Sequence, residues 1–196
     1  MDDYDFLNMV KRRRTIRNYS GKGISEQQLR YIIEAGNTAP SPHNVRPWYI
    51  VGMGNLIKIQ QLADRYLSQI SYTDTDTDIH MHKRVINSIR QSGAVIGVFL
   101  PNWRKEIYPE AGILVWEDVL QVIGAVVQNM LLAGHSLGLG MAWLNQPVED
   151  RFLNLFSKEF DIDGRLMAFA TIGHPLVQRH MIPPRYNDEE TVKIIF

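Results

Sequence analysis

A run of arginines near the N-terminus contains the residue types best suited to hold an anion. Residues 12–17 read Arg-Arg-Arg-Thr-Ile-Arg. A guanidinium group is permanently charged and donates hydrogen bonds in a planar fork, which suits a phosphate or the carbonyl edge of a planar ring. If the chain is extended here, side chains alternate in direction, so that Arg13, Thr15 and Arg17 share one side. Arg14 and Ile16 then share the other side.

Two other interpretations of this basic segment stay open from composition alone. Cations are favoured at the C-terminal end of a helix, so the arginines could be a solvated helix end. A nucleic-acid patch is less well supported, because the 21 Lys plus Arg are balanced by 21 Asp plus Glu and no aromatics are interleaved. Any electropositive site in this neutral chain must therefore be local.

A proline-stiffened segment is the second candidate. Residues 39–48 read Ala-Pro-Ser-Pro-His-Asn-Val-Arg-Pro-Trp, which must be irregular because proline lacks a donor and disfavours helix in the residue before it. Such a loop presents Ser41 and Asn44 with little conformational entropy left to lose on binding. We interpret His43 as an exposed imidazole without a general-base role, and Trp48 as a core anchor.

The third candidate is a glycine-rich turn at residues 138–140, Gly-Leu-Gly. It is not a dinucleotide fingerprint, because no glycine stands three residues after Gly140 and the glycines close a helix instead of opening one. We expect a helix C-cap and a sharp turn into a strand. That turn would deliver Leu144 and Asn145 to the end of the sheet.

Hydrophobic periodicity and capping signals predict the elements that position these candidates. The first helix ends at the basic cluster 11–14, and a Ser25-x-x-Gln28 capping box opens the second, which closes near Gly36. Further helices are expected over 56–70, 83–91, 119–139 and 148–156, with strands over 48–51, 94–100, 141–144 and 166–172. We expect a solvated loop at 71–78, an irregular connection at 102–115 and an extended tail from Gly173.

The uneven alternation of these helices and strands favours an α+β sandwich within a single domain spanning residues 1–196. The apolar stretch 119–139 contains Gln121, Gln128 and Asn129, so we interpret it as a buried helix of the core or of a subunit interface rather than a membrane span. The acidic N-terminus lacks the pattern of a secretory signal, and we expect a cytoplasmic protein.

Taken together and in this order, the segments resemble the nitroreductase family over nearly the whole chain. The matching motifs are Arg-Arg-Thr-Ile-Arg at 13–17, Ala-Pro-Ser-x-x-Asn-x-x-Pro-Trp at 39–48, Gln-Asn-Met-Leu-Leu-Ala-x-x-x-Leu-Gly-Leu-Gly-x-x-Trp at 128–143 and Pro-Pro-Arg at 183–185. The resemblance is weakest over residues 70–115.

The resemblance implies a three-layer α/β/α sandwich with a mostly antiparallel central sheet, in a homodimer with exchanged terminal arms. Two FMN molecules would lie at the dimer interface, and NAD(P)H would be the co-substrate. Hydride would pass through FMN to a small acceptor, such as a nitroaromatic or a quinone, in a ping-pong cycle. Flavin fragmentation, reductive dehalogenation and a non-catalytic flavin sensor are the alternatives within the same fold. Neither a nucleic acid nor a membrane is an expected partner.

The resemblance also assigns FMN contacts to the matching positions and requires no catalytic acid or base. Arg17 would tune the flavin at its N1 and C2 carbonyl edge. Contacts to the phosphate, ribityl chain and pyrimidine edge are implied for Arg13, Arg14, Thr15 and Arg17, with Arg185 reaching the phosphate. The other subunit would contribute Pro40, Ser41, Pro42 and Asn44, and backbone groups near the flavin N5 and O4 would come from Leu144 and Asn145.

Several positions depart from the family pattern or fall in its variable part. Arg46 stands where many relatives have Gln, and Pro183 stands where a second basic residue often helps to hold the phosphate. Residues that could line an acceptor pocket are His80, Met81, His82, Trp103, Tyr108 and Trp116. We do not interpret His80 and His82 as a metal pair, because no third ligand is evident nearby.

Overall fold

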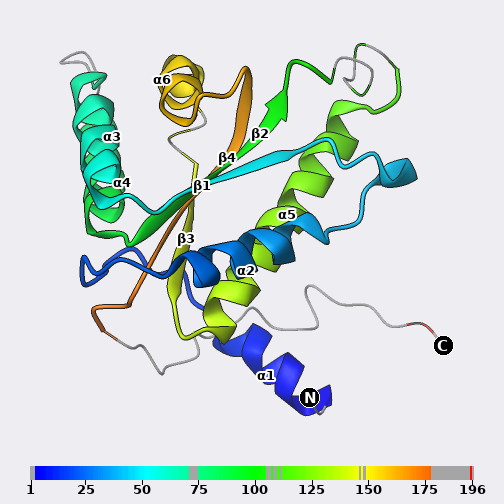
Figure 1. Ribbon diagram of the computed structural model, residues 1–196, viewed down its shortest axis with the longest axis horizontal. Helices are drawn as coiled ribbons and strands as arrows, with labels where there is room; N and C mark the ends of the chain where they lie inside the picture. Colours follow the sequence, from blue (N-terminus) through cyan, green and yellow to red (C-terminus); the bar gives the residue numbers. More distant parts are fainter. Residues whose placement is uncertain are drawn as a thin grey trace.

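A computed structural model describes residues 3–70, 75–104, 107, 110, 112–145, 147, 149–177 and 195. Figure 1 shows a sheet crossed by helices on both faces. In chain order the elements are α1 (Asp3–Arg12), α2 (Glu26–Asn37), the short 3₁₀ helix η1 (Pro42–Asn44), β1 (Tyr49–Met53), α3 (Leu56–Ser68), α4 (Asp76–Gln91), β2 (Ala94–Pro101), α5 (Trp116–Ser136), β3 (Gly140–Leu144), α6 (Asp150–Phe160) and β4 (Gly164–Gly173).

The sheet has the order β1-β2-β4-β3, and each pairing between these strands is antiparallel. Strand β2 is buried along its whole length because helices cover both faces. Its side chains alternate, so Ile96 and Val98 pack with α2 and α5, whereas Val95 and Phe99 pack with α3, α4 and α6. The predicted α+β sandwich is confirmed.

Most of the predicted element positions are confirmed, and their caps explain them. In the α2 capping box, the Gln28 amide donates to Ser25 Oγ at 3.1 Å and the Ser25 amide donates to Gln28 Oε1 at 2.9 Å. After α5, Gly138 adopts φ +73 and the Leu139 amide bonds the Gly134 carbonyl at 2.9 Å. This is the predicted glycine C-cap.

Helix boundaries differ from the prediction at α4 and α6. The α4 helix begins at Asp76 rather than Lys83, because the Thr75 side chain accepts a hydrogen bond from the Asp78 amide at 3.2 Å. Acidic residues in that first turn also favour the positive end of the helix dipole. Residues 76–78 are thus helical and not part of a solvated loop, and residues 71–74 lie outside the described residues. The α6 helix runs from Asp150 to Phe160, not from Val148 to Phe156.

The α5 helix, which starts a few residues before the predicted position, is long and apolar enough by composition to cross a membrane. In the structure, 50% of its most apolar stretch is buried inside the protein. It packs against α2 and the sheet through residues such as Val126 and Met130. The helix therefore contributes to the core, as the interspersed polar residues indicated.

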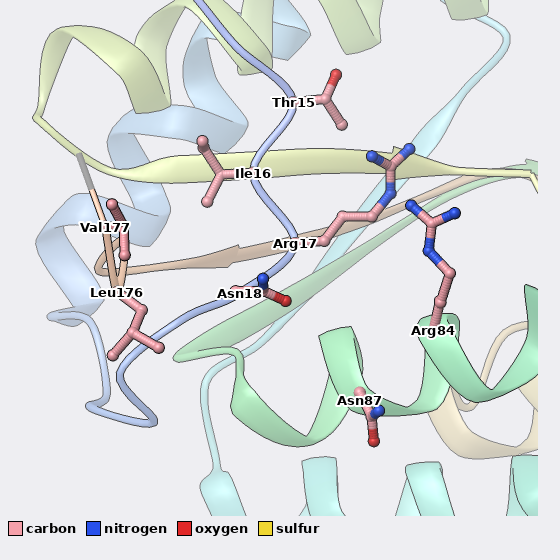
Figure 2. Close-up of a pocket in the computed structure, with 8 residues that line it drawn as sticks. All are labelled: Thr15, Ile16, Arg17, Asn18, Arg84, Asn87, Leu176 and Val177. Atoms are coloured by element: carbon pink, nitrogen blue, oxygen red, sulfur yellow. The ribbon is translucent and has the colours of Figure 1, made fainter. Parts of the chain in front are cut away.

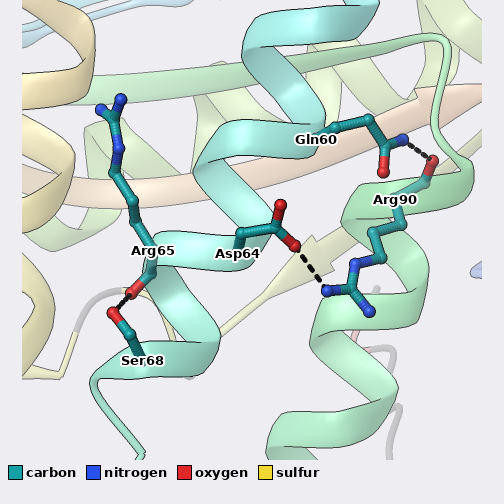
Figure 3. A network of polar contacts seen from close by, with 5 residues as sticks. All are labelled: Gln60, Asp64, Arg65, Ser68 and Arg90. Atoms are coloured by element: carbon teal, nitrogen blue, oxygen red, sulfur yellow. Dashed lines mark hydrogen bonds and ion pairs between the residues drawn. The ribbon is translucent and has the colours of Figure 1, made fainter.

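The α3 and α4 helices lie side by side and are joined by polar contacts (Figure 3). Gln60 Nε2 donates to the Arg90 carbonyl at 2.7 Å, and Arg90 Nη2 lies 2.6 Å from Asp64 Oδ1. Arg65 pairs with Glu159 and so connects α3 to α6. Exposed pairs of this kind each contribute only about 0–1 kcal/mol. Their geometric effect is to hold α4 in a fixed place against its neighbours.

The protein has one hydrophobic core between the sheet, α2 and α5, and a second between the sheet, α3, α4 and α6. A cluster of aromatic rings fills the second core. The Tyr66 and Phe152 ring centroids are 4.4 Å apart, and Tyr66 Oη lies 2.7 Å from His82 Nδ1. His82 is thus a buried core residue and does not line an acceptor pocket. His80 is exposed, so the two histidines do not face a common site.

A pair of glycines on adjacent strands lets the chain after α1 approach the sheet closely. Gly140 of β3 pairs with Gly173 of β4. A Cβ atom on Gly140 would lie 2.7 Å from Ile16 Cβ, and one on Gly173 would lie 2.9 Å from Tyr19 Cγ. Neither distance is tolerated between real carbon atoms, so the glycines form the contact surface for Ile16 and Tyr19.

We predict that Gly140→Ala lowers the free energy of unfolding by about 1–3 kcal/mol, because overpacking must displace Ile16. The measurement is urea denaturation. Gly54→Ala is the control, since its Cβ would meet Leu29 Cδ2 at an ordinary 3.7 Å, and it should stay within about 0.5 kcal/mol of the wild type. A Gly140→Ala variant as stable as Gly54→Ala would show that Ile16 does not depend on this contact.

Candidate functional site

The segment that follows α1 forms backbone hydrogen bonds with β3, with the chain after β4 and with the end of α4, which meet at one end of the sheet. Thr15 forms an isolated bridge with Met141 of β3, and the Ile16 amide donates to the Met141 carbonyl at 3.0 Å. Further bonds run from the Ser20 amide to the His174 carbonyl (3.0 Å), from the Leu176 amide to the Asn18 carbonyl (3.1 Å) and from the Gly21 amide to the Gln91 carbonyl (3.1 Å). The predicted extended segment is thus held against β3, the chain after β4 and the end of α4.

This segment forms one wall of a pocket of about 350 Å³. Figure 2 shows Thr15 and Arg17 extending to one side of the segment and Ile16 to the other, as alternation predicts. Arg84 of α4 extends its guanidinium group toward that of Arg17. The lining residues are Thr15, Ile16, Arg17, Asn18, Arg84, Asn87, Leu176 and Val177.

The pocket is electropositive although the chain has no net charge. No acidic side chain is among its described lining residues, and within the described part of the chain neither Arg17 nor Arg84 forms an ion pair. By contrast, Arg30, Arg65 and Arg90 each pair with a carboxylate. Two guanidinium groups at one place, with no carboxylate partner in the part of the chain that the structure describes, make a site for an anion or for a ring edge rich in carbonyl oxygens.

Sequence reasoning missed Arg84 and Asn87. Their spacing of three residues on a predicted helix was the only available signal, and it indicates a shared helix face without indicating what that face contacts. The α4 helix lies next to the segment after α1 because the Gly21 amide donates a hydrogen bond to the Gln91 carbonyl at the end of α4. That pairing is a long-range feature of the fold.

The other arginines of the basic segment have different surroundings. Arg13 and Arg14 are half-buried and are not among the described residues that line the pocket. Arg13 lies near His135 at the end of α5, and the pKa of His135 is lowered by burial and then by the charges of Arg13 and Arg12. Positive charge thus extends from the pocket toward the C-terminal end of α5.

The proline loop is stiffened by Arg46, which the sequence did not indicate. The Arg46 amide donates to Ser41 Oγ at 3.0 Å and its Nε donates to Asn44 Oδ1 at 3.1 Å. His43, Asn44 and Arg46 all adopt positive φ values, of 50, 54 and 45, a backbone region that costs non-glycine residues about 1–3 kcal/mol each. Both bonds use acceptor oxygens, so the hydroxyl proton of Ser41 and the amide protons of Asn44 are left to donate to a ligand.

Within one chain the predicted site residues fall into two groups. Leu144 is the last residue of β3, the strand that forms the bridge with Thr15, and Asn145 follows it. The loop with Pro40, Ser41, Pro42 and Asn44 follows the C-terminal end of α2, well away from the segment after α1 in Figure 1. Arg185 and Pro183 lie outside the described residues. One chain therefore does not bring the loop to Arg17.

Of the remaining aromatic predictions, that for Trp48 is confirmed, whereas an acceptor-pocket role of Trp103 and Trp116 stays a prediction. Trp48 is a core residue, as expected, and its Nε1 donates to Asn37 Oδ1 at 3.0 Å. Trp103 and Trp116 are exposed, the first against Tyr49 with ring centroids 5.5 Å apart. Tyr108 lies outside the described residues.

Comparisons with known proteins identify the family and the fold. Residues 10–174 match the model of the nitroreductase family. A relative from Methanothermobacter thermautotrophicus, provisionally named an NADH dehydrogenase/NAD(P)H nitroreductase, is 26% identical over 174 residues, covering 87% of this chain and 78% of the relative.

Solved structures give the same result for the fold. A provisionally named nitroreductase in complex with FMN from Desulfovibrio desulfuricans has a TM-score of 0.68 and 26% identity, covering 97% of each chain. A nitroreductase with bound FMN from Desulfitobacterium hafniense has a TM-score of 0.75 and 18% identity, covering 98% of each chain.

The surroundings of His135 predict a pH dependence of stability. Because its pKa in the folded protein is below the ordinary 6.5, the unfolded chain binds the proton more readily, and stability is lost as the pH falls through and below that value. Between about pH 7.5 and pH 5, the melting temperature of the wild type should fall more than that of His135→Gln. Parallel melting profiles would contradict this account of His135.

Proposed function

The chain belongs to the nitroreductase family, and we propose that it is an FMN-dependent oxidoreductase that uses NAD(P)H as the reductant. The observation that carries the proposal is the pair of cations, Arg17 and Arg84, in one pocket, neither of which is paired with a carboxylate among the described residues. Support also comes from relatives whose names or structures include FMN and NAD(P)H. The small-molecule acceptor is proposed to be a nitroaromatic, a quinone or a similar electron-poor compound.

The residues present fit FMN. Its phosphate is anionic and the pyrimidine edge of its ring carries carbonyl oxygens, so it needs cations and hydrogen-bond donors without competing carboxylates. Arg17, Arg84, Thr15 and Asn87 supply these donors around the pocket. A volume of about 350 Å³ is within the range of small-molecule sites. Arg13, Arg14 and Arg185 are proposed to bind the phosphate and ribityl chain.

When bound, FMN would supply the chemistry of hydride transfer between NAD(P)H and the acceptor. The contribution of the chain is electrostatic. Arg17 and Arg84 stabilise negative charge at the ring edge that they bind, and their charge is already in position before the ligand arrives. Leu144 and Asn145 would offer backbone groups near the flavin N5 and O4. No side-chain acid or base of this chain is required, and one slot would receive the reductant and the acceptor in turn.

We further propose that the enzyme is a homodimer with shared sites. Pro40, Ser41, Pro42 and Asn44 of one subunit would complete the site that Arg17 of the other begins, because the loop lies well away from the segment after α1 within one chain (Figure 1). A second subunit could also bury large apolar side chains that are exposed within one chain, including Phe6 on α1 (53%) and Leu120 on α5 (61%).

The purified protein should be yellow, with the visible absorbance of bound flavin, and NADPH or NADH under nitrogen should bleach it. Adding a nitroaromatic or a quinone should then restore the colour without oxygen. A colourless protein that takes up no added FMN would rule out the proposed cofactor. Bound flavin that neither nucleotide bleaches would instead favour a non-catalytic flavin sensor or different flavin chemistry.

Arg17→Ala and Arg84→Met should each weaken FMN binding about tenfold or more, because a hydrogen bond to a charged group contributes about 1.5–3 kcal/mol. Fluorescence titration with FMN measures the effect. Matched controls are Arg30→Ala, which removes an exposed arginine paired with Glu26, and Lys83→Met, which removes an exposed cation of α4 that is not among the described residues lining the pocket. Equal losses in the controls would attribute the effect to net charge and not to the pocket.

A further inference from the structure

Three buried hydroxyl groups form a continuous series of hydrogen bonds between α4, which carries Arg84, and the segment that carries Arg17. Ser88 of α4 lies with its Oγ 2.9 Å from Thr171 Oγ1 of β4, which in turn lies 2.9 Å from Tyr19 Oη. Tyr19 Oη lies 2.5 Å from the carbonyl oxygen of Ile16. The three residues are nearly inaccessible to solvent.

Each hydroxyl group of this series donates its proton to the next group in the direction of the Ile16 carbonyl. A carbonyl oxygen only accepts, so Tyr19 donates its single proton to Ile16. Tyr19 Oη can then only accept from Thr171, and Thr171 Oγ1 accepts from Ser88. The Thr171 carbonyl is a second acceptor near Tyr19 Oη, but at 3.1 Å it is the longer contact. Burial raises the pKa of the Tyr19 phenol above its ordinary value, so the donor keeps its proton.

The hydrogen bond from Tyr19 Oη to the Ile16 carbonyl fixes the peptide group between Ile16 and Arg17. The Ile16 carbonyl belongs to that peptide, and the Ile16 amide on the other side is bonded to Met141 of β3 at 3.0 Å. At the other end, Ser88 follows Arg84 by one turn of α4. The three hydroxyl groups, which we call the hydroxyl relay, thus connect the backbone next to Arg17 with the turn of α4 that follows Arg84.

We propose that this relay holds Arg17 and Arg84 together in a ligand-ready arrangement, which makes Tyr19 a positioning residue for the flavin site. Two like charges in one pocket repel each other, and without a restraint the segment carrying Arg17 would move away from α4. Restraining it before binding lowers the ordering cost that the ligand must otherwise meet. The inference rests on the proposed function, because it names the pocket ligand as FMN.

The test compares two variants that each remove one buried tyrosine hydroxyl. Tyr19→Phe breaks the relay at its last bond. Tyr66→Phe removes an equally buried hydroxyl in the other core, where it contacts His82 Nδ1 at 2.7 Å. The full-length, flavin-loaded proteins are diluted, and FMN release is followed by the return of its fluorescence; the midpoint potential of the bound flavin and the melting temperature are measured in parallel.

Tyr19→Phe should raise the FMN dissociation constant about tenfold, the equivalent of one hydrogen-bond contribution, and shift the midpoint potential to a more negative value. Tyr66→Phe should lower the melting temperature and leave both flavin properties unchanged. If Tyr19→Phe does not fold, Thr171→Val breaks the relay one bond earlier and should change both flavin properties in the same direction.

Wild-type flavin properties in Tyr19→Phe or, where that variant does not fold, in Thr171→Val would overturn the inference. Equal effects in Tyr66→Phe would also overturn it, because they would reflect general loss of stability. A wild type that binds no FMN would instead overturn the proposed function on which the inference rests.

Discussion

The close approach of one backbone segment to a pair of glycines determines the rest of the site. Gly140 and Gly173 are paired across β3 and β4, and only their missing side chains let Ile16 and Tyr19 lie against the strands. Backbone bonds then hold the segment on both sides of Ile16, and the alternation of an extended chain sends Arg17 into the pocket. The same contact pairs the Met141 carbonyl at the edge of β3, which would otherwise be an unpaired edge group.

The positive charges of Arg17 and Arg84 suit the pocket to an anionic ligand. The chain is neutral, yet Arg17 and Arg84 meet in a pocket whose described lining contains no carboxylate. Like charges brought together in a folded protein raise its free energy unless a partner compensates them. Here the compensation is proposed to come from the ligand. The repulsion is opposed by contacts outside the pocket, namely the bonds to β3, the hydroxyl relay and the packing of α4 on α3 (Figure 3).

Features set by neighbouring residues could be predicted from the sequence, whereas features set by distant contacts could not. The Ser25 capping box and the Gly138 C-cap were predicted correctly because their signals lie within one turn of chain. The start of α4 was placed too late because Thr75 lay in a stretch of Asp and Thr that is typical of loops. Arg84 was missed because nothing local indicates that α4 meets the segment after α1. Gly140 was assigned to the turn, although its close approach to Ile16 is the stricter requirement.

We propose that two chains share the site, since the proline loop lies well away from the segment after α1 within one chain (Figure 1). A crystal structure of the protein grown with FMN tests this most directly. We expect the pyrimidine edge of the flavin within hydrogen-bond distance of Arg17 and Arg84 of one subunit, with Ser41 and Asn44 of a second subunit against the ring. A flavin bound elsewhere, or a ring held by Arg17 in a monomer without the loop of another chain, would contradict the account.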